Sequence, residues 1–182
     1  VRRIFTTVKA VINLAVAEHG LDIRNAFAAI YMPEAEGKKR VSIPVETIRQ
    51  IQQSCIEHDD DMRWLIALIS DTGMRLAEAA GLHVDDIKLD EDIPYVGIKP
   101  HPWRSLKTRG SQRQVPLVGA SLWAAQRIQA NASSCFAFPR YTDNTRCNAN
   151  SASNALNKWL HANFRKDIVI HGFRHAMRDL LR

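Results

Sequence analysis

Apolar residues recur at helical spacing along most of the chain and predict seven helices. In residues 4–18 the apolar positions share one face, and His19-Gly20 is a common signal for a helix C-terminus. The acidic run Asp59-Asp60-Asp61 suits the start of the helix that follows it, because carboxylates cap and stabilise helix N-termini. The six later helices are predicted at residues 44–58, 62–70, 74–80, 120–131, 151–164 and 172–182.

Three short segments predict strands, at residues 84–89, 94–99 and 113–118. The polar, basic segment 100–112 would join the second strand to the third. The predicted fold class is therefore mainly α with a small three-stranded antiparallel β-sheet.

A polar segment divides the chain at residues 32–43, which contain Pro, Gly and the basic run Lys38-Lys39-Arg40. We interpret it as a basic linker between residues 1–31 and a larger domain at residues 44–182. The apolar face of the first helix needs a partner, and the last predicted helix still runs at the final residue. We therefore expect both ends of the chain to be trimmed.

Composition excludes several classes of protein. With 46% hydrophobic residues among 182, the chain can bury a core, and Gly and Pro are too sparse for a disordered or fibrous protein. No apolar run approaches the roughly 18 residues of a membrane span, and no signal peptide opens the sequence. Three scattered cysteines are too few for a disulfide framework, so a reduced, cytoplasmic protein is expected.

Charge is unevenly distributed between the two halves of the chain. Residues 1–98 hold 11 basic and 16 acidic residues, a net charge of −5. Residues 99–182 hold 14 basic residues and 3 acidic ones, a net charge of +11. A half this basic indicates a surface that faces a polyanion, since Lys and Arg release counterions from phosphates. A merely soluble basic face is the alternative.

Arg75 is the first candidate for chemistry, at the start of an apolar helix directly after a turn. A planar guanidinium there can grip two oxygens of a phosphate, although an ion pair with Glu78 would also explain it. His171 and Arg174 are three residues apart at the start of a helix and so share a face, which suits an oxyanion or phosphate. Lys107 lies in the segment before the third strand, where a mobile lysine can donate a proton to a leaving oxygen.

The order of these pieces is more specific than any one of them. The run TGMRLAEAAGL at residues 72–82, then Lys107 before RQVPL at 113–117, then HGFRH at 171–175, resembles the tyrosine recombinase (phage integrase) family. The similarity extends over residues 44–182 and implies that family's catalytic-domain fold, incomplete at its C-terminus. Residues 4–31 are similar to the last helix of the family's core-binding domain.

The resemblance implies a role for four residues. Arg75 and Arg174 would bind the phosphate, Lys107 would protonate the departing 5′ oxygen, and His171 would assist proton transfer at the nucleophile. Phosphoryl transfer by such a site needs no metal or cofactor, because fixed guanidiniums stabilise the charge on the non-bridging oxygens. Glu78 would orient Arg75.

Other residues compete for two of these roles. His175 is adjacent to the box and would replace His171 if the helix were rotated. The alternatives to Lys107 are Arg104, Arg109 and Lys99. Trp103, in the same basic segment, would either pack against a DNA sugar or cover the sheet.

The tyrosines depart from the family's pattern. The family places its nucleophilic tyrosine some tens of residues beyond the His-x-x-Arg box, and here only eight residues follow Arg174. Tyr31, Tyr95 and Tyr141 all precede the box. We therefore expect this chain to lack the attacking group and not to cleave DNA by itself.

The resemblance implies that the parent protein is a prophage-type integrase, which recombines DNA at specific sites through a 3′-phosphotyrosine intermediate. Its partner would be double-stranded DNA at attachment sites, bound by a homotetramer when the protein is complete, in the cytoplasm of a bacterial host. No membrane or small-molecule substrate is expected. The alternative is a DNA-binding module without chemistry, either a decayed integrase or a regulator of attachment sites, and a helical domain of unrelated function is a third reading.

Overall fold

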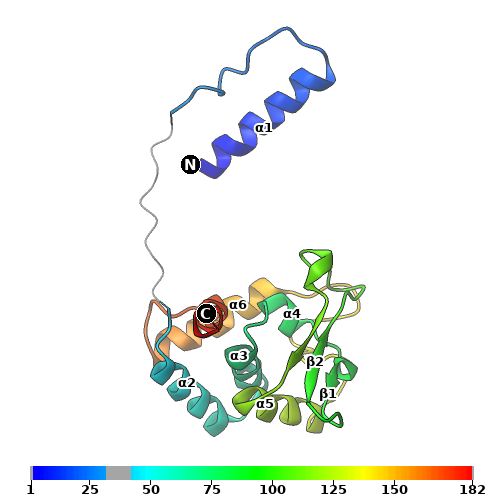
Figure 1. Ribbon diagram of the computed structural model, residues 1–182, viewed down its shortest axis with the longest axis vertical. Helices are drawn as coiled ribbons and strands as arrows, with labels where there is room; N and C mark the ends of the chain where they lie inside the picture. Colours follow the sequence, from blue (N-terminus) through cyan, green and yellow to red (C-terminus); the bar gives the residue numbers. More distant parts are fainter. Residues whose placement is uncertain (1, 32–41, 182) are drawn as a thin grey trace. The chain divides into compact units, whose positions relative to one another are not determined.

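The computed structural model describes residues 2–31 and 42–181, and the chain divides into two compact units, residues 1–40 and 41–182 (Figure 1). Most of the predicted linker at 32–43 lies outside the described residues, as does the final residue. No helix among the described residues is long and apolar enough to cross a membrane.

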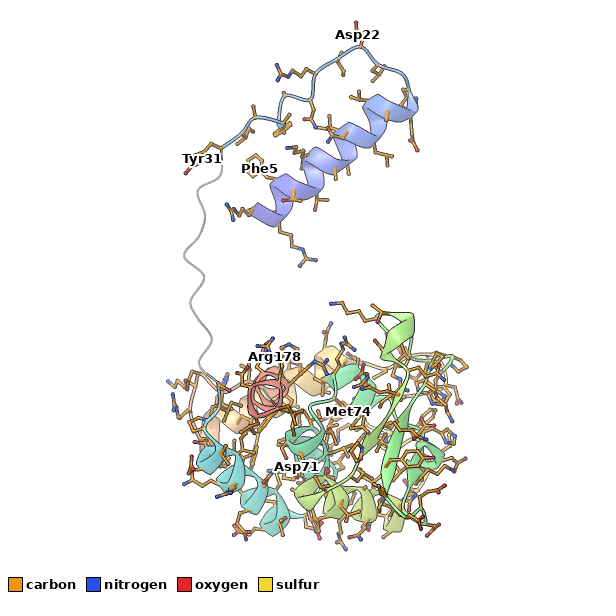
Figure 2. The ribbon with its side chains drawn as sticks, in the orientation of Figure 1. Phe5, Asp22, Tyr31, Asp71, Met74 and Arg178 are labelled. Atoms are coloured by element: carbon orange, nitrogen blue, oxygen red, sulfur yellow. The ribbon has the colours of Figure 1, made fainter. Side chains whose placement is uncertain are left out.

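The first unit consists of α1 (Arg2–Glu18) and a segment that folds back along it. The Phe5 and Phe27 rings lie 6.1 Å apart, and the Asn25 amide donates to the Lys9 carbonyl at 3.0 Å (Figure 2). No residue of α1 is buried, and its apolar side chains at Ile4 and Val11 are 68% and 60% exposed. The predicted apolar face of this helix is thus largely uncovered.

The second unit is built around α3 (Asp61–Thr72), whose consecutive residues from Leu65 to Ser70 are all buried. This helix packs against α2, α5 and α7, and its C-terminal end contacts the short α4 (Figure 1). A helix that is apolar on all sides belongs at the centre of a domain. The helices around it are α2 (Val45–His58), α4 (Leu76–Ala80), α5 (Gly119–Ala130), α6 (Ala149–Asn163) and α7 (Ile170–Leu180).

Polar contacts fix both ends of α3. Asp60 accepts a hydrogen bond from the Arg63 N–H at 3.0 Å and caps the N-terminus, which confirms the capping role predicted for the acidic run. In the last turn Asp71 accepts from the Gln52 side chain of α2 at 2.6 Å and from the Ser121 N–H of α5 at 3.2 Å (Figure 2). One buried helix thereby sets the positions of its neighbours.

A three-stranded antiparallel sheet, in the order β1-β2-β3, completes this unit. Its strands are β1 (Ile87–Lys88), β2 (Tyr95–Ile98) and β3 (Arg113–Pro116). Val96 of β2 lies opposite Ile87 on one side and Val115 on the other, and all three are buried. The predicted fold class is confirmed.

All three predicted strands are too long, the second by one residue at each end and the other two by more. Residues 84–86 form a 3-10 turn, because His83 Nδ1 accepts a hydrogen bond from the Asp85 N–H at 3.1 Å and caps that turn. β3 ends at Pro116 because Val118 is already the N-cap of α5. The last helix begins at Ile170 and ends at Leu180, and Leu181 is its C-cap. The prediction that this helix continues through residue 181 is therefore wrong.

Gly81, at the C-terminal end of α4, tests the packing between this helix and the β2–β3 segment. A Cβ at this position would lie 2.8 Å from Arg104 Cδ and 3.0 Å from the Ala77 carbonyl oxygen. Gly81→Ala should lower the free energy of unfolding by about 1–3 kcal/mol, measured by urea denaturation. Gly110→Ala is the control, since nothing lies within 4 Å of its added Cβ, and an equal loss in both variants would contradict the packing argument.

Candidate active site

Arg75 is positioned by the tight turn between α3 and α4. Gly73 ends α3 in the left-handed region, at φ 57°, and its N–H donates to the Ile69 carbonyl at 3.0 Å. A Cβ on Gly73 would lie 3.1 Å from Met177, so α7 approaches this turn closely. Met74 is buried, and Arg75 follows as the N-cap of α4.

Glu78, one turn later, holds Arg75 in place. Glu78 is buried, and its carboxylate accepts from the Arg75 backbone N–H at 2.9 Å and from Arg75 Nη1 at 2.6 Å. Arg113 of β3 donates to the same carboxylate, from Nη2 at 2.9 Å and Nη1 at 3.4 Å. Burial acts to raise the pKa of Glu78, but the hydrogen bonds from Arg113 and Arg75 outweigh it and hold the pKa below its usual 4.5.

Arg174 reaches the same place from α7. Its Nη1 donates to the Gly73 carbonyl at 2.6 Å, a contact between residues 101 positions apart. Burial, followed by the positive charge of Arg75, lowers the pKa of Arg174, and Arg113 adds to this effect. The predicted pair Arg75 and Arg174 is therefore brought together, and we call these two residues with Glu78 and Arg113 the arginine site.

A pocket of about 590 Å³ opens beside the arginine site, between the end of α3, β3 and α7. Its lining includes Arg113, Arg174 and Arg178 and no acidic residue. Three guanidiniums without a carboxylate on the pocket wall form a surface for an anion, and their forked donors match phosphate oxygens.

The two histidines of the last helix differ in position. His175 lines the pocket, whereas His171 is exposed in the first turn of α7. Their rings are 4.8 Å apart and almost perpendicular. His171 is thus one turn removed from the pocket wall but in contact with a histidine that forms part of it.

Lys107 lies where it was predicted, in the segment that joins β2 to β3, and its side chain is exposed. It makes no hydrogen bond or ion pair with the described part of the chain. Its neighbour Thr108 shares a hydrogen bond of 2.9 Å with Ser111, and Ser111 accepts from Arg75 Nη1 at 3.2 Å. The segment that carries Lys107 is thereby connected to the arginine site.

The competitors of Lys107 are engaged elsewhere. Arg104 is 4% exposed and donates to the Glu78 carbonyl and, at 2.5 Å, to the Lys99 carbonyl, and burial lowers its pKa. Lys99 forms an ion pair with Asp86 at 2.7 Å. The side chain of Arg109 lies outside the described part of the molecule.

Trp103 has a packing role in this fold. Its indole N–H donates to the Gly81 carbonyl at 3.0 Å, and its ring stacks on His101 with centroids 4.5 Å apart. Phe136 meets the same ring edge to face. These contacts of Trp103 are therefore with residues outside the three strands, and neither predicted role, packing against a DNA sugar or covering the sheet, is tested by them.

None of the three tyrosines lines the pocket beside the arginine site. Tyr31 is 86% exposed in the first unit, and Tyr95 belongs to β2. Tyr141 is 4% exposed, and burial raises its pKa, which opposes ionisation of the hydroxyl. Among the described residues there is also no group of three or more His, Cys, Asp or Glu side chains that could hold a metal ion.

Sequence reasoning missed Arg113. A signal was present, because residues two apart in a strand face the same side, and Arg113 therefore shares the inward face of β3 with buried Val115. A charged residue on an inward face needs a partner of opposite charge. That partner, Glu78, lies 35 positions earlier in the chain.

Comparison with known proteins identifies the family. Residues 41–181 match the model of the phage integrase family, and the chain belongs to this family, the tyrosine recombinases. A search of curated proteins finds no significant match.

Solved structures of tyrosine recombinases share the fold at low sequence identity. The Tn1549 transposon integrase in complex with transposon right end DNA superposes with a TM-score of 0.65 and 16% identity over 97% of this chain and 64% of that one. The same integrase with a circular intermediate DNA gives a TM-score of 0.68 and 15% identity over 99% and 65%. XerA recombinase gives 0.59 and 14% over 97% and 59%. The chain thus spans less than two thirds of each structure.

The lowered pKa of Glu78 predicts how stability depends on pH. A carboxyl group whose pKa is lower in the folded state stabilises the protein above its unfolded pKa, and this contribution is lost as the pH falls below about 4.5. Glu78→Gln should lower the free energy of unfolding at pH 7 and reduce its further fall between about pH 4.5 and 3, measured by urea denaturation across that range. Glu91→Gln removes an exposed carboxylate and should behave as the wild type; an unchanged slope in Glu78→Gln would contradict the assignment.

Proposed function

We propose that the protein acts in site-specific DNA recombination, and that this chain supplies the groups that bind and activate the phosphodiester bond. The observation that supports this proposal best is the arginine site beside a pocket with a basic wall. In it, guanidiniums from the α3–α4 turn and β3 bind one buried carboxylate, and the guanidinium of Arg174 in α7 binds the carbonyl of Gly73. Such an arrangement stabilises the charge that develops on a phosphate during transfer.

We assign the roles of the individual residues as the family resemblance implies them. Arg75 and Arg174 bind the non-bridging oxygens of the scissile phosphate. Within the described residues the side-chain hydrogen bonds of Arg75 leave from Nη1, so Nε and Nη2 remain to donate to a ligand. Lys107, on its exposed segment, protonates the departing 5′ oxygen. His171 exchanges a proton with the nucleophile, and its neighbour His175 faces the pocket.

The nucleophile in this proposal is a tyrosine that forms a 3′-phosphotyrosine bond and leaves the 5′ oxygen to be protonated. None of the tyrosines of this chain lines the pocket. We therefore assign the attack to a tyrosine outside the given sequence and expect the chain alone to bind DNA without cleaving it.

Double-stranded DNA is the proposed partner. The net charge of +11 over residues 99–182 favours a polyanion, and the Tn1549 integrase structures that share the fold are complexes with DNA. We further propose that the complete protein assembles as a tetramer at attachment sites. Its origin would be of the prophage type, and it would act in the cytoplasm of a bacterial host.

One observation favours a second candidate function, a DNA-binding module that performs no chemistry. It is the absence of any tyrosine of this chain from the pocket lining. A module of this kind would bind duplex DNA with an affinity that falls steeply with salt, and no covalent complex would form with any natural form of the gene product.

Arg174→Ala tests the phosphate-binding role. In the gene product that contains this chain, the variant should no longer form covalent complexes with a nicked attachment-site duplex, because the transferring phosphate loses one of its two guanidinium donors. Denaturing gel electrophoresis measures the covalent complex. Arg140→Ala removes an exposed arginine paired with Asp61 and should form adducts as the wild type does. Undiminished adducts in Arg174→Ala would contradict the role.

Lys107→Ala tests the general acid. Cleavage should slow by about 10²–10⁴-fold, because the 5′ oxygen then leaves unprotonated. A substrate with sulfur in place of that oxygen needs no protonation and should be cleaved by the variant at close to the wild-type rate. Lys88→Ala, an exposed lysine of β1, is the control for lost charge. An equal defect with both substrates would exclude Lys107 as the acid.

A further inference from the structure

Arg113 and Arg75 share a single carboxylate. Glu78 accepts side-chain hydrogen bonds from both guanidiniums, at 2.6 Å from Arg75 Nη1 and 2.9 Å from Arg113 Nη2. The carboxylate is 4% exposed, whereas the Arg75 and Arg113 side chains are 32% and 31% exposed. One buried negative charge therefore faces two partly exposed positive charges, and the three groups together carry a net positive charge.

A second contact links Arg113 to the segment before β3. Its Nη1 donates to the Ser111 carbonyl at 2.8 Å, and the Ser111 hydroxyl accepts from Arg75 Nη1 at 3.2 Å. Ser111 is 5% exposed. Arg113 thus contacts both residues that accept from the Arg75 guanidinium, Glu78 at its carboxylate and Ser111 at its main-chain carbonyl.

We propose that Arg113 is a positioning residue for the phosphate site, which fixes Arg75 through Glu78 and Ser111 and leaves Arg75 with unneutralised charge for the ligand. This inference rests on the proposed phosphate-binding function and adds a residue to it. Arg113 also lines the pocket, but the role assigned to it is an indirect one, exerted on Arg75 through Glu78 and Ser111, to which its guanidinium donates.

The physical consequence concerns how the charge of Glu78 is divided. With Arg113 present, each guanidinium is only partly neutralised, because the carboxylate serves both. Without Arg113, Glu78 would pair with Arg75 alone, and an ion pair of one carboxylate and one guanidinium attracts a phosphate far less than a free guanidinium does. Neutralising Glu78 in that background should then return the charge to Arg75.

The test is a titration of the full chain with inorganic phosphate. Binding is monitored through the NMR signals of the arginine Nε–H groups. Arg113→Ala should weaken the affinity seen at Arg75 by about five- to twentyfold, a usual size for coupling within such a network. Arg113→Lys keeps the charge and one contact with Glu78, so it should retain most of the affinity. Arg113→Ala combined with Glu78→Gln should recover affinity to within about threefold of the wild type. Arg140→Ala, matched in charge, should bind phosphate unchanged.

The outcomes separate this inference from the function on which it rests. If phosphate leaves the Arg75 and Arg174 signals of the wild type unmoved, the proposed phosphate site is wrong. If the wild type binds phosphate and Arg113→Ala binds it equally well, only the role of Arg113 is wrong. If the double variant loses more affinity than Arg113→Ala, Arg113 serves the fold alone and the inference is overturned. The melting temperature of each variant shows that it is folded under the conditions of the titration.

Discussion

The buried carboxylate of Glu78 is the interaction on which the site depends. Three guanidiniums gathered at one end of a domain repel one another, and burial together with the positive charges of Arg75 and Arg113 lowers the pKa of Arg174. Glu78 balances part of that charge while it accepts hydrogen bonds from two of the three arginines. Its burial leaves it out of reach of a ligand, so the pocket wall stays basic. A single negative charge thus makes a strongly positive site compatible with a folded domain.

The packing of the core brings segments that are distant in the sequence close to the Glu78 carboxylate. The central helix α3 packs against α7 and ends at Gly73, whose carbonyl accepts from Arg174. The sheet presents Arg113 on its inward face and carries the segment with Lys107. Because α3 is buried from Leu65 to Ser70 and its last turn is hydrogen-bonded to α2 and α5, the turn that holds Arg75 has little freedom. Such preorganisation means that little reorganisation is needed when charge develops on a phosphate.

Local signals in the sequence predicted much of this arrangement. Helical periodicity located every helix of the second unit, with errors of about two residues at the ends, since those ends depend on caps such as Asn148 and Asp60. The Arg75 and Arg174 motifs predicted the two residues that the structure brings together. The first strand was overextended because a histidine cap produces a turn at residues 84–86, and nothing in the alternation of residues there reveals the cap. Arg113 was missed because its partner is far away in the sequence.

The sequence by itself determined the helices, the small sheet, the basic character of the second half and the family motifs, because each of these depends on residues close together in the chain or on composition. Only the tertiary structure decided which charges meet. The hydrogen bonds of Arg113 with Glu78, Arg174 with Gly73, Arg104 with Glu78 and Trp103 with Gly81 join residues separated by 35, 101, 26 and 22 positions. Such contacts depend on how the helices and the sheet pack together, and hydrophobic periodicity specifies which face of an element is buried without specifying what that face will meet.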